Sequence, residues 1–229
     1  MTRTELAAKI DHTILKPEAT EAEVLRVAAE GAHHRFASIC VAPAWVAKVA
    51  AALRGSDVPV CSVVAFPHGT SKATVKAIEA TVAVKDGAGE IDVVAHLPHL
   101  AAGDLDAVRA ELLEVARAAR AVRRDVVLKV ILETAYLLSL GSERGEAAIA
   151  AGCRAARESG FDFVKTSTGF HPAGGASTMA VALLKKYGEG MLVKASGGIR
   201  DWPMAKAMLD AGADRLGMSA SVGVLSAEC

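Results

Sequence analysis

The chain has 229 residues, 52% of them hydrophobic, and its 26 Lys and Arg residues balance 26 Asp and Glu residues. A net charge of zero excludes the basic surface typical of nucleic-acid-binding proteins, so we expect a small-molecule partner. No apolar run is long enough to span a bilayer, and the N-terminus lacks an apolar signal core. We therefore expect a cytoplasmic protein with no membrane partner.

Short runs rich in Val, Ile and Phe alternate along the chain with longer Ala-rich stretches that carry charges at helical spacing. There are eight such short runs, and seven of them are followed by an amphipathic stretch. This pattern predicts repeated strand–helix units and a parallel sheet. The predicted strands are Ile10–Ile14, Phe36–Val41, Val58–Ala65, Glu90–Ala95, Val126–Leu132, Phe161–Thr166, Met191–Ala195 and Asp214–Met218.

Helix boundary signals agree with this division. Thr20-x-x-Glu23 reads as a capping box, and Asp201 stands where an N-cap is expected, two residues before Pro203. Glycines stand where helices are expected to end, because glycine readily adopts the left-handed conformation of many helix C-termini. These glycines are Gly31, Gly87, Gly160, Gly188 and Gly212.

No linker or low-complexity segment interrupts the eight units. We therefore predict an α/β protein with one (β/α)8 TIM-barrel domain over residues 1–229, with an open doubly wound sheet as the alternative. The dinucleotide fingerprint G-x-G-x-x-G is missing after the first predicted strand, which weakens that alternative. In such a barrel, functional residues are expected at the C-terminal ends of the strands.

Two lysines close neighbouring predicted strands in the same pattern, V-K-x-S-x-G, at Lys165 and Lys194. Adjacent strands lie roughly 4.8 Å apart, so two inward-facing lysines at matching points would be close. Like charge and burial both favour the neutral amine, so we expect at least one of the two to have a lowered pKa. A neutral lysine can attack a carbonyl to form a Schiff base. Alternatively, each lysine simply extends to solvent from its strand end.

Other charged or polar residues are candidates near these lysines. Asp92 lies in an otherwise apolar predicted strand, where a carboxylate would either move protons or form a structural salt bridge. Lys129 is a plausible partner for it. Asp11 is either a site residue on the first strand or a local hydrogen-bonding group, and Thr166 is a candidate supporting residue beside Lys165.

Glycines after the last three predicted strands suggest an anion site. Barrels often hold phosphate with the loops after strands seven and eight, and glycine lets backbone N–H groups approach an oxyanion closely. The candidate residues are Gly169, Gly197, Gly198, Gly217 and Ser219.

Other site chemistries have weaker support. The seven histidines include two close pairs, His33-His34 and His96-x-x-His99, but no H-E-x-x-H motif, so we expect no metal site. No G-x-S-x-G elbow indicates a serine hydrolase. Four scattered cysteines, without a C-x-x-C pair, are expected to be reduced thiols. They are Cys40, Cys61, Cys153 and Cys229.

Several ordered motifs together resemble the deoxyribose-phosphate aldolase family, over nearly the whole chain. The motifs are Ile10-Asp-His-Thr-Ile-Leu-Lys-Pro17, Val63-Val-Ala-Phe-Pro67, Gly89-Glu-Ile-Asp-Val-Val94, Lys129-Val-Ile-Leu-Glu-Thr134, Phe163-Val-Lys-Thr-Ser-Thr-Gly-Phe170 and Val193-Lys-Ala-Ser-Gly-Gly-Ile-Arg200. The resemblance implies a class I aldolase that cleaves 2-deoxyribose 5-phosphate, with a phosphosugar substrate, no cofactor and a dimer or tetramer of identical chains.

The same resemblance assigns roles to individual residues. Lys165 matches the lysine that forms the imine, Lys194 the second lysine that perturbs it, and Asp92 the aspartate that relays protons. The residues that match the family's phosphate site are Gly169, Gly197, Gly198, Gly217 and Ser219. Two other functions stay open: another phosphosugar lyase or isomerase on the same barrel, and a non-catalytic phosphosugar-binding protein.

Three departures from the family pattern matter. His96 and Pro98 replace an asparagine and a glycine that usually follow the aspartate, so we expect a reshaped loop there. After the eighth predicted strand, a small residue or glycine is common in the family at the place of Met218 or Ser221, which affects the expected phosphate affinity. The chain ends at Glu228-Cys229 without the tyrosine tail of many members, so we expect either slower proton exchange at the imine carbon or another group that takes the place of the tyrosine.

Overall fold

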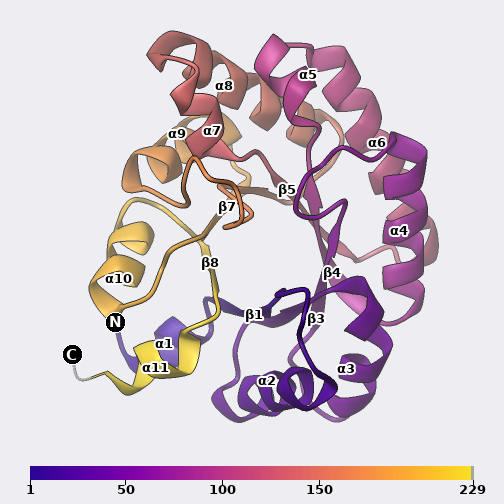
Figure 1. Ribbon diagram of the computed structural model, residues 1–229, viewed down its shortest axis with the longest axis vertical. Helices are drawn as coiled ribbons and strands as arrows, with labels where there is room; N and C mark the ends of the chain where they lie inside the picture. Colours follow the sequence, from indigo (N-terminus) through magenta and orange to yellow (C-terminus); the bar gives the residue numbers. More distant parts are fainter. Residues whose placement is uncertain (228–229) are drawn as a thin grey trace.

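Eight parallel strands close into a barrel in the computed structural model, which describes residues 1–227 (Figure 1). The strands follow chain order around the barrel, and β8 pairs with β1. They are Ile10–Ile14 (β1), Ser38–Val41 (β2), Val60–Val64 (β3), Ala88–Val94 (β4), Val127–Ile131 (β5), Phe163–Lys165 (β6), Leu192–Ser196 (β7) and Arg215–Met218 (β8). The closure confirms the predicted (β/α)8 barrel over the open sheet. The predicted limits also include Glu228 and Cys229, which lie outside the described residues.

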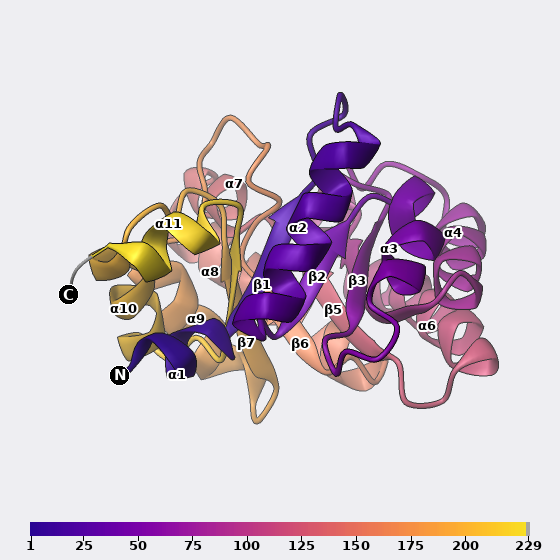
Figure 2. The same cartoon turned by 90° about the horizontal axis from the view of Figure 1, so that it is seen from below.

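Helices surround the strands and form the outer layer (Figures 1 and 2). They are Arg3–Ala7 (α1), Glu21–His34 (α2), Val46–Ala52 (α3), Ala73–Lys85 (α4), Leu97–Ala102 (α5), Leu105–Val122 (α6), Thr134–Ser139 (α7), Ser142–Glu158 (α8), Thr178–Gly188 (α9), Trp202–Asp210 (α10) and Ser221–Ser226 (α11), with a 3-10 turn at Pro43–Trp45 (η1). Within residues 1–227, no helix is long and apolar enough to cross a membrane.

Local sequence explains most of the element boundaries. The capping box of Thr20 and Glu23 opens α2, and the Asp201 side chain accepts a hydrogen bond from the backbone N–H of Met204 at 2.8 Å. The prediction that Gly31 ends a helix was wrong, because α2 continues to His34 and Arg35 takes the left-handed conformation. A Cβ at position 31 would lie 1.9 Å from Ile39 Cδ1, so Gly31 lets α2 approach β2 closely.

The main apolar core lies between the strands and the helices, and it includes Ile39, Ile91, Leu112 and Val193. The barrel interior holds a small apolar group of Cys40, Cys61 and Val63, together with the charged side chains described below. The thiols of Cys40, Cys61 and Cys153 are buried and free, as predicted, whereas Cys229 lies outside the described residues.

The C-terminal ends of the strands share one end of the barrel. Figure 2 shows the loop between β1 and α2 and the loop between β6 and α9 rising together at this end. Because parallel strands all deliver their last side chains here, residues far apart in sequence meet at this end.

Candidate active site

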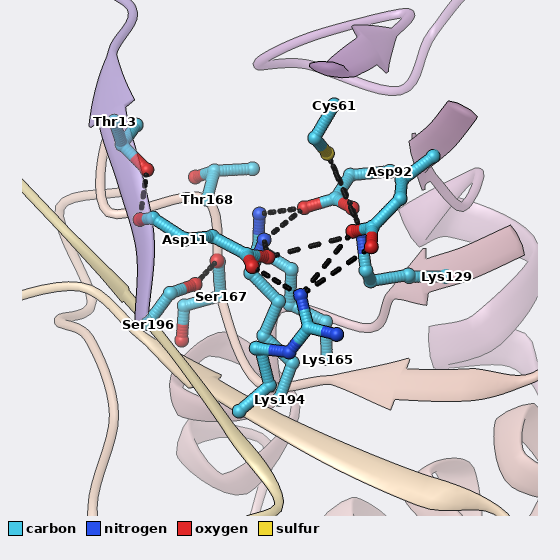
Figure 3. Close-up of polar contacts among 12 residues, drawn as sticks. Asp11, Thr13, Cys61, Asp92, Lys129, Lys165, Ser167, Thr168, Lys194 and Ser196 are labelled. Carbon is cyan, nitrogen blue, oxygen red and sulfur yellow. Dashed lines mark hydrogen bonds and ion pairs between the residues drawn. The ribbon is translucent and has the colours of Figure 1, made fainter. Parts of the chain in front are cut away.

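Lys165 and Lys194 are direct register partners on β6 and β7. The ammonium groups of both contact the same carboxylate oxygen, Asp92 Oδ2, each at 2.7 Å (Figure 3). Asp92 and Lys194 are fully buried, and the Lys165 side chain is 4% exposed. The alternative in which the two lysines extend to solvent is therefore wrong, and the three predicted central residues lie together.

The contacts of Asp92 extend into a larger buried cluster. Lys129 Nζ lies 2.8 Å from Asp92 Oδ1 and 2.6 Å from Glu90 Oε2. Asp11 forms ion pairs with Lys194 and, at 2.6 Å, with Arg215. These contacts place Asp11 and Lys129, both predicted as supporting residues, beside the central three. Glu90 and Arg215 complete the cluster, although the sequence pattern did not single them out.

Opposite charges in this cluster set the protonation of its members. Burial would raise the pKa of Asp92, but the three lysine ammonium groups outweigh it and hold that pKa well below its usual range. The pKa of Asp11 is lowered in the same way, by Lys194, Lys129 and Arg215. The structure thus keeps both carboxylates ionised in the barrel interior.

We expected a lowered pKa for at least one of the two lysines, and Lys194 does not have one. Burial alone would lower the pKa of Lys194, but the carboxylates of Asp11 and Asp92 raise it above its ordinary value. The pKa of Lys129 is raised likewise, against the effect of burial, mainly by Asp92. The repeated sequence pattern shows the neighbouring lysine but not that Asp11 and Asp92 both contact Lys194, so it does not predict the direction of the pKa shift of Lys194.

The low pKa values of Asp11 and Asp92 predict acid sensitivity. A carboxyl group whose pKa is lower in the folded than in the unfolded protein stabilises the folded state fully at pH values above its unfolded-state pKa. This stabilisation is lost as the pH falls through the folded-state pKa. We expect the free energy of unfolding to decrease steadily below about pH 5, as measured by denaturant titration. The Asp11→Asn variant should show a shallower decrease, and an equal slope in both proteins would contradict this origin.

A cavity of about 460 Å³ opens above the cluster. Segments that follow β1, β6, β7 and β8 line it, and Lys165 forms part of its wall. All five residues predicted for an anion site belong to the lining, namely Gly169, Gly197, Gly198, Gly217 and Ser219. Lys16, Arg26 and Arg200 also belong to the lining, whereas Glu23 is its one acidic member and already pairs with Lys16 at 2.6 Å. The lining is therefore positively charged.

Two glycines of the lining allow close approaches that a side chain would prevent. Gly197 has a φ of 95°, and a Cβ there would lie 3.1 Å from the Gly169 Cα. A Cβ on Gly217 would lie 2.7 Å from Ser196 Cβ and 3.2 Å from Lys194 Cε. Gly217 therefore leaves the room through which the Lys194 side chain reaches the cluster.

Gly217→Ala is expected to lower activity and to reduce the free energy of unfolding by about 1–3 kcal/mol, the usual effect of overpacking. Its matched control is Gly223→Ala in α11, where a Cβ meets nothing within 4 Å. That control should be neutral or stabilising by up to about 1 kcal/mol, because alanine favours helix. Thermal denaturation with an activity assay measures both variants, and equal behaviour of the two would show that position 217 is not crowded.

Glu133 and Thr168 are two polar residues near the cavity that were not among the predicted site residues. Glu133 is buried, with a left-handed backbone at φ 53°, and its carboxylate accepts from the Thr168 hydroxyl at 2.7 Å and from the Thr168 N–H. This contact fixes the segment that leads to Gly169.

Thr166, which was predicted as a supporting residue beside Lys165, forms hydrogen bonds with the backbone of Ser196 and so connects β6 to β7. It does not line the cavity.

The segment after Asp92 turns directly into a short helix. His96 is the N-cap of α5, Pro98 lies in its first turn, and the His96 N–H donates to Glu111 at 3.2 Å. Neither of the two tyrosines in the chain lines the cavity. Tyr136 packs near His171, and the Tyr187 hydroxyl forms a hydrogen bond with Glu146.

Two sets of potential metal ligands lie inside the barrel, Cys40 with Cys61 and Asp92, and Asp11 with Cys61 and Glu90. The ammonium of Lys129 already lies among these groups, 3.4 Å from Cys61 Sγ, 2.8 Å from Asp92 and 2.6 Å from Glu90. A metal cation would meet that positive charge at short range. The donor set therefore fits the lysine rather than a metal.

A buried lysine–carboxylate cluster below a cationic cavity, at the C-terminal end of a (β/α)8 barrel, is typical of barrel enzymes that act on small anionic molecules. The model of the DeoC/LacD family aldolases matches residues 6–226. The deoxyribose-phosphate aldolase of Mycobacterium avium is 50% identical over 98% of this chain and 97% of its own length. That of Caldanaerobacter subterraneus is 47% identical over 96% and 92%.

A solved structure agrees with these sequence relatives. The tetrameric deoxyribose phosphate aldolase from Aeropyrum pernix superposes with a TM-score of 0.87 at 35% identity, over 98% of this chain and 91% of that one. The chain belongs to the DeoC/LacD family of aldolases. This membership confirms the resemblance inferred from the sequence motifs.

Proposed function

We propose that the protein reversibly cleaves 2-deoxy-D-ribose 5-phosphate to D-glyceraldehyde 3-phosphate and acetaldehyde, through a Schiff base on Lys165. The observation that carries the proposal is the position of Lys165, whose ammonium meets Asp92 below and whose side chain lines the cationic cavity above. The named substrates of the relatives at about half identity support the choice of sugar.

Charge counting supports Lys165 as the nucleophile. The cluster contains four cationic groups, Lys129, Lys165, Lys194 and Arg215, but three carboxylates, Asp11, Glu90 and Asp92. Loss of one proton from the cluster therefore gives equal numbers of positive and negative groups. The three cations other than Lys165 have raised pKa values, with their carboxylate partners overcoming the effect of burial. Lys165 is also the one of these four cations that lines the cavity, so its amine is the one best placed to meet a substrate carbonyl.

The reaction then follows from the positions of these groups. Neutral Lys165 attacks C1 of the open-chain sugar, and Asp92 with water moves the protons that let water leave and an iminium form. The C2–C3 bond breaks as the C3 hydroxyl loses its proton, and the iminium accepts the electron pair. This bond is the one that gives the stated products, because breakage of the C3–C4 bond would leave the phosphate on a two-carbon fragment instead of on glyceraldehyde 3-phosphate. The enamine is finally protonated at C2 and hydrolysed to acetaldehyde.

The cavity supplies the binding half of the proposal. Gly169, Gly197, Gly198, Gly217 and Ser219 line it together with Arg200. Held there, the phosphate would keep C1 beside Lys165 and lower the entropic barrier of the attack. The steps use an amine, a carboxylate and water, so the proposal involves no metal or organic cofactor.

Assembly and compartment remain predictions. The Aeropyrum pernix relative is described as tetrameric, which supports the expectation of a dimer or tetramer for this chain. Light scattering of the purified protein measures that state directly. The cytoplasmic localisation of the protein stays a prediction from the sequence.

Borohydride reduction in the presence of acetaldehyde tests the nucleophile. We expect peptide mass analysis to find a reduced two-carbon adduct on Lys165. Labelling of another lysine, or no label, would overturn the assignment. A panel of phosphosugars tests the substrate, because a different phosphosugar lyase or isomerase would prefer another member, and a non-catalytic binding protein would turn over none.

A further inference from the structure

A buried histidine connects two walls of the cavity. His12 lies on β1 and is 2% exposed. Its Nδ1 lies 2.9 Å from the hydroxyl of Ser221, the first residue of α11, and its Nε2 lies 2.8 Å from a carboxylate oxygen of Glu30 on α2. One imidazole ring therefore spans from α2 to the start of α11.

Each partner of His12 leads to residues that line the cavity. The Ser221 hydroxyl lies 3.1 Å from the carbonyl oxygen of Met218, and Met218 and Ser219 are part of the lining. On the other side, the second oxygen of Glu30 holds Arg26, which also lines the cavity. His12 thus connects the β8–α11 segment to the α2 wall opposite it.

The order of serine, histidine and carboxylate matches a hydrolytic triad, but the burial does not. Ser221 is fully buried and is not part of the cavity lining, so no substrate carbonyl can reach its oxygen. These three groups are therefore suited to hold parts of the structure in place rather than to attack a substrate.

The hydrogen-bond chemistry gives each group a defined role. Burial lowers the pKa of His12 and outweighs the opposing effect of Glu30, which favours a neutral ring with one N–H group. The ionised Glu30 carboxylate can only accept, so Nε2 carries the hydrogen and Nδ1 accepts from the Ser221 hydroxyl. When this hydroxyl donates its one proton to Nδ1, it cannot also donate to the Met218 carbonyl, so His12 holds Ser221 itself, three residues after Met218.

We propose that His12 is a positioning residue that, through Ser221, fixes the Gly217–Ser219 segment and so shapes the phosphate end of the cavity. This inference rests on the proposed function, because it assumes that the substrate phosphate binds there. His12 itself touches no reacting atom.

The test is a comparison of two substrates with the Ser221→Ala and His12→Leu variants. We expect KM for 2-deoxyribose 5-phosphate to rise about tenfold, the effect of losing one net hydrogen bond, with kcat little changed. The kcat/KM for 2-deoxyribose, which lacks the phosphate, should stay at the wild-type value. His12→Asn, whose amide lies on the Nδ1 side, should recover part of the affinity. The matched control is Ser226→Ala, at an exposed serine of the same helix.

Inorganic phosphate separates this inference from the proposed function. We expect phosphate to raise the melting temperature of the wild type and to raise it less in Ser221→Ala. If the wild type fails to cleave the sugar phosphate, the proposed function fails, but the phosphate comparison still decides the inference. Equal phosphate stabilisation of both proteins, or an equal loss of activity on both sugars, would overturn the positioning role. Should His12→Leu not fold, Ser221→Ala alone carries the test.

Discussion

Replacing Lys165 by methionine should abolish turnover while leaving the free energy of unfolding unchanged or higher. Loss of a nucleophile typically lowers the rate by about 10⁴-fold or more. Stability should not fall, because the variant leaves three cations with the three carboxylates of the cluster. A methionine side chain can fill the space of the lysine stem without adding charge.

Lys129→Met is the matched comparison, because it removes another buried cation from the same cluster. Lys129 contacts both Glu90 and Asp92, and its loss leaves Glu90 with only a longer contact to Arg215, at 3.4 Å, in place of the Lys129 contact at 2.6 Å. Breaking such a buried pair costs about 3–5 kcal/mol. Denaturant unfolding and a coupled assay for glyceraldehyde 3-phosphate measure both variants. Equal destabilisation by the two substitutions would contradict the charge argument for Lys165.

Asp92→Asn should remove both activity and stability. The Asp92 carboxylate contacts the ammonium groups of Lys129, Lys165 and Lys194, and asparagine keeps its size but not its charge. We expect a loss of about 3–5 kcal/mol in the free energy of unfolding, because buried cations lose their partner. Turnover should fall by about 10²–10⁴-fold, since Asp92 also moves protons in the proposed mechanism.

A double variant separates these two effects of Asp92. Adding Lys165→Met to Asp92→Asn removes one of the unpaired cations, so part of the lost stability should return while activity stays absent. Residues in direct contact give such non-additive energies in a double-mutant cycle. Asp57→Asn, at an exposed surface position, is the neutral control. Strict additivity of the two substitutions would show that these charges are not coupled.

Strand periodicity allowed most of the fold and the centre of the site to be predicted. Lys165 and Lys194 each close a strand in the same pattern, and the barrel brings the ends of β6 and β7 into register. Glu90 and Arg215 were missed, although a signal existed. Glu90 lies two residues before Asp92, and Arg215 two before Gly217, so in a strand each shares a face with a predicted site residue.

Other parts of the site depend on contacts that no local pattern records. Glu133 meets Thr168 because its backbone turns left-handed after β5, a conformation uncommon for glutamate. His12 meets Ser221 across 209 positions of sequence. The sign of the Lys194 pKa shift likewise depends on Asp11, which comes from the opposite end of the chain. Long-range pairs of this kind follow only from the closed barrel.

The buried cluster reaches solvent at Lys165, Glu90 and Arg215, whose side chains are 4%, 6% and 18% exposed. Of these three, Lys165 lines the cavity, whereas Asp11, Asp92, Lys129 and Lys194 have no exposed surface. Hydrogens on the amines of Lys129 and Lys194 can therefore exchange with solvent only past these three residues, and a bound sugar would cover the route past Lys165. In heavy water, hydrogen exchange at the two buried amines should slow, but not stop, when the sugar is bound.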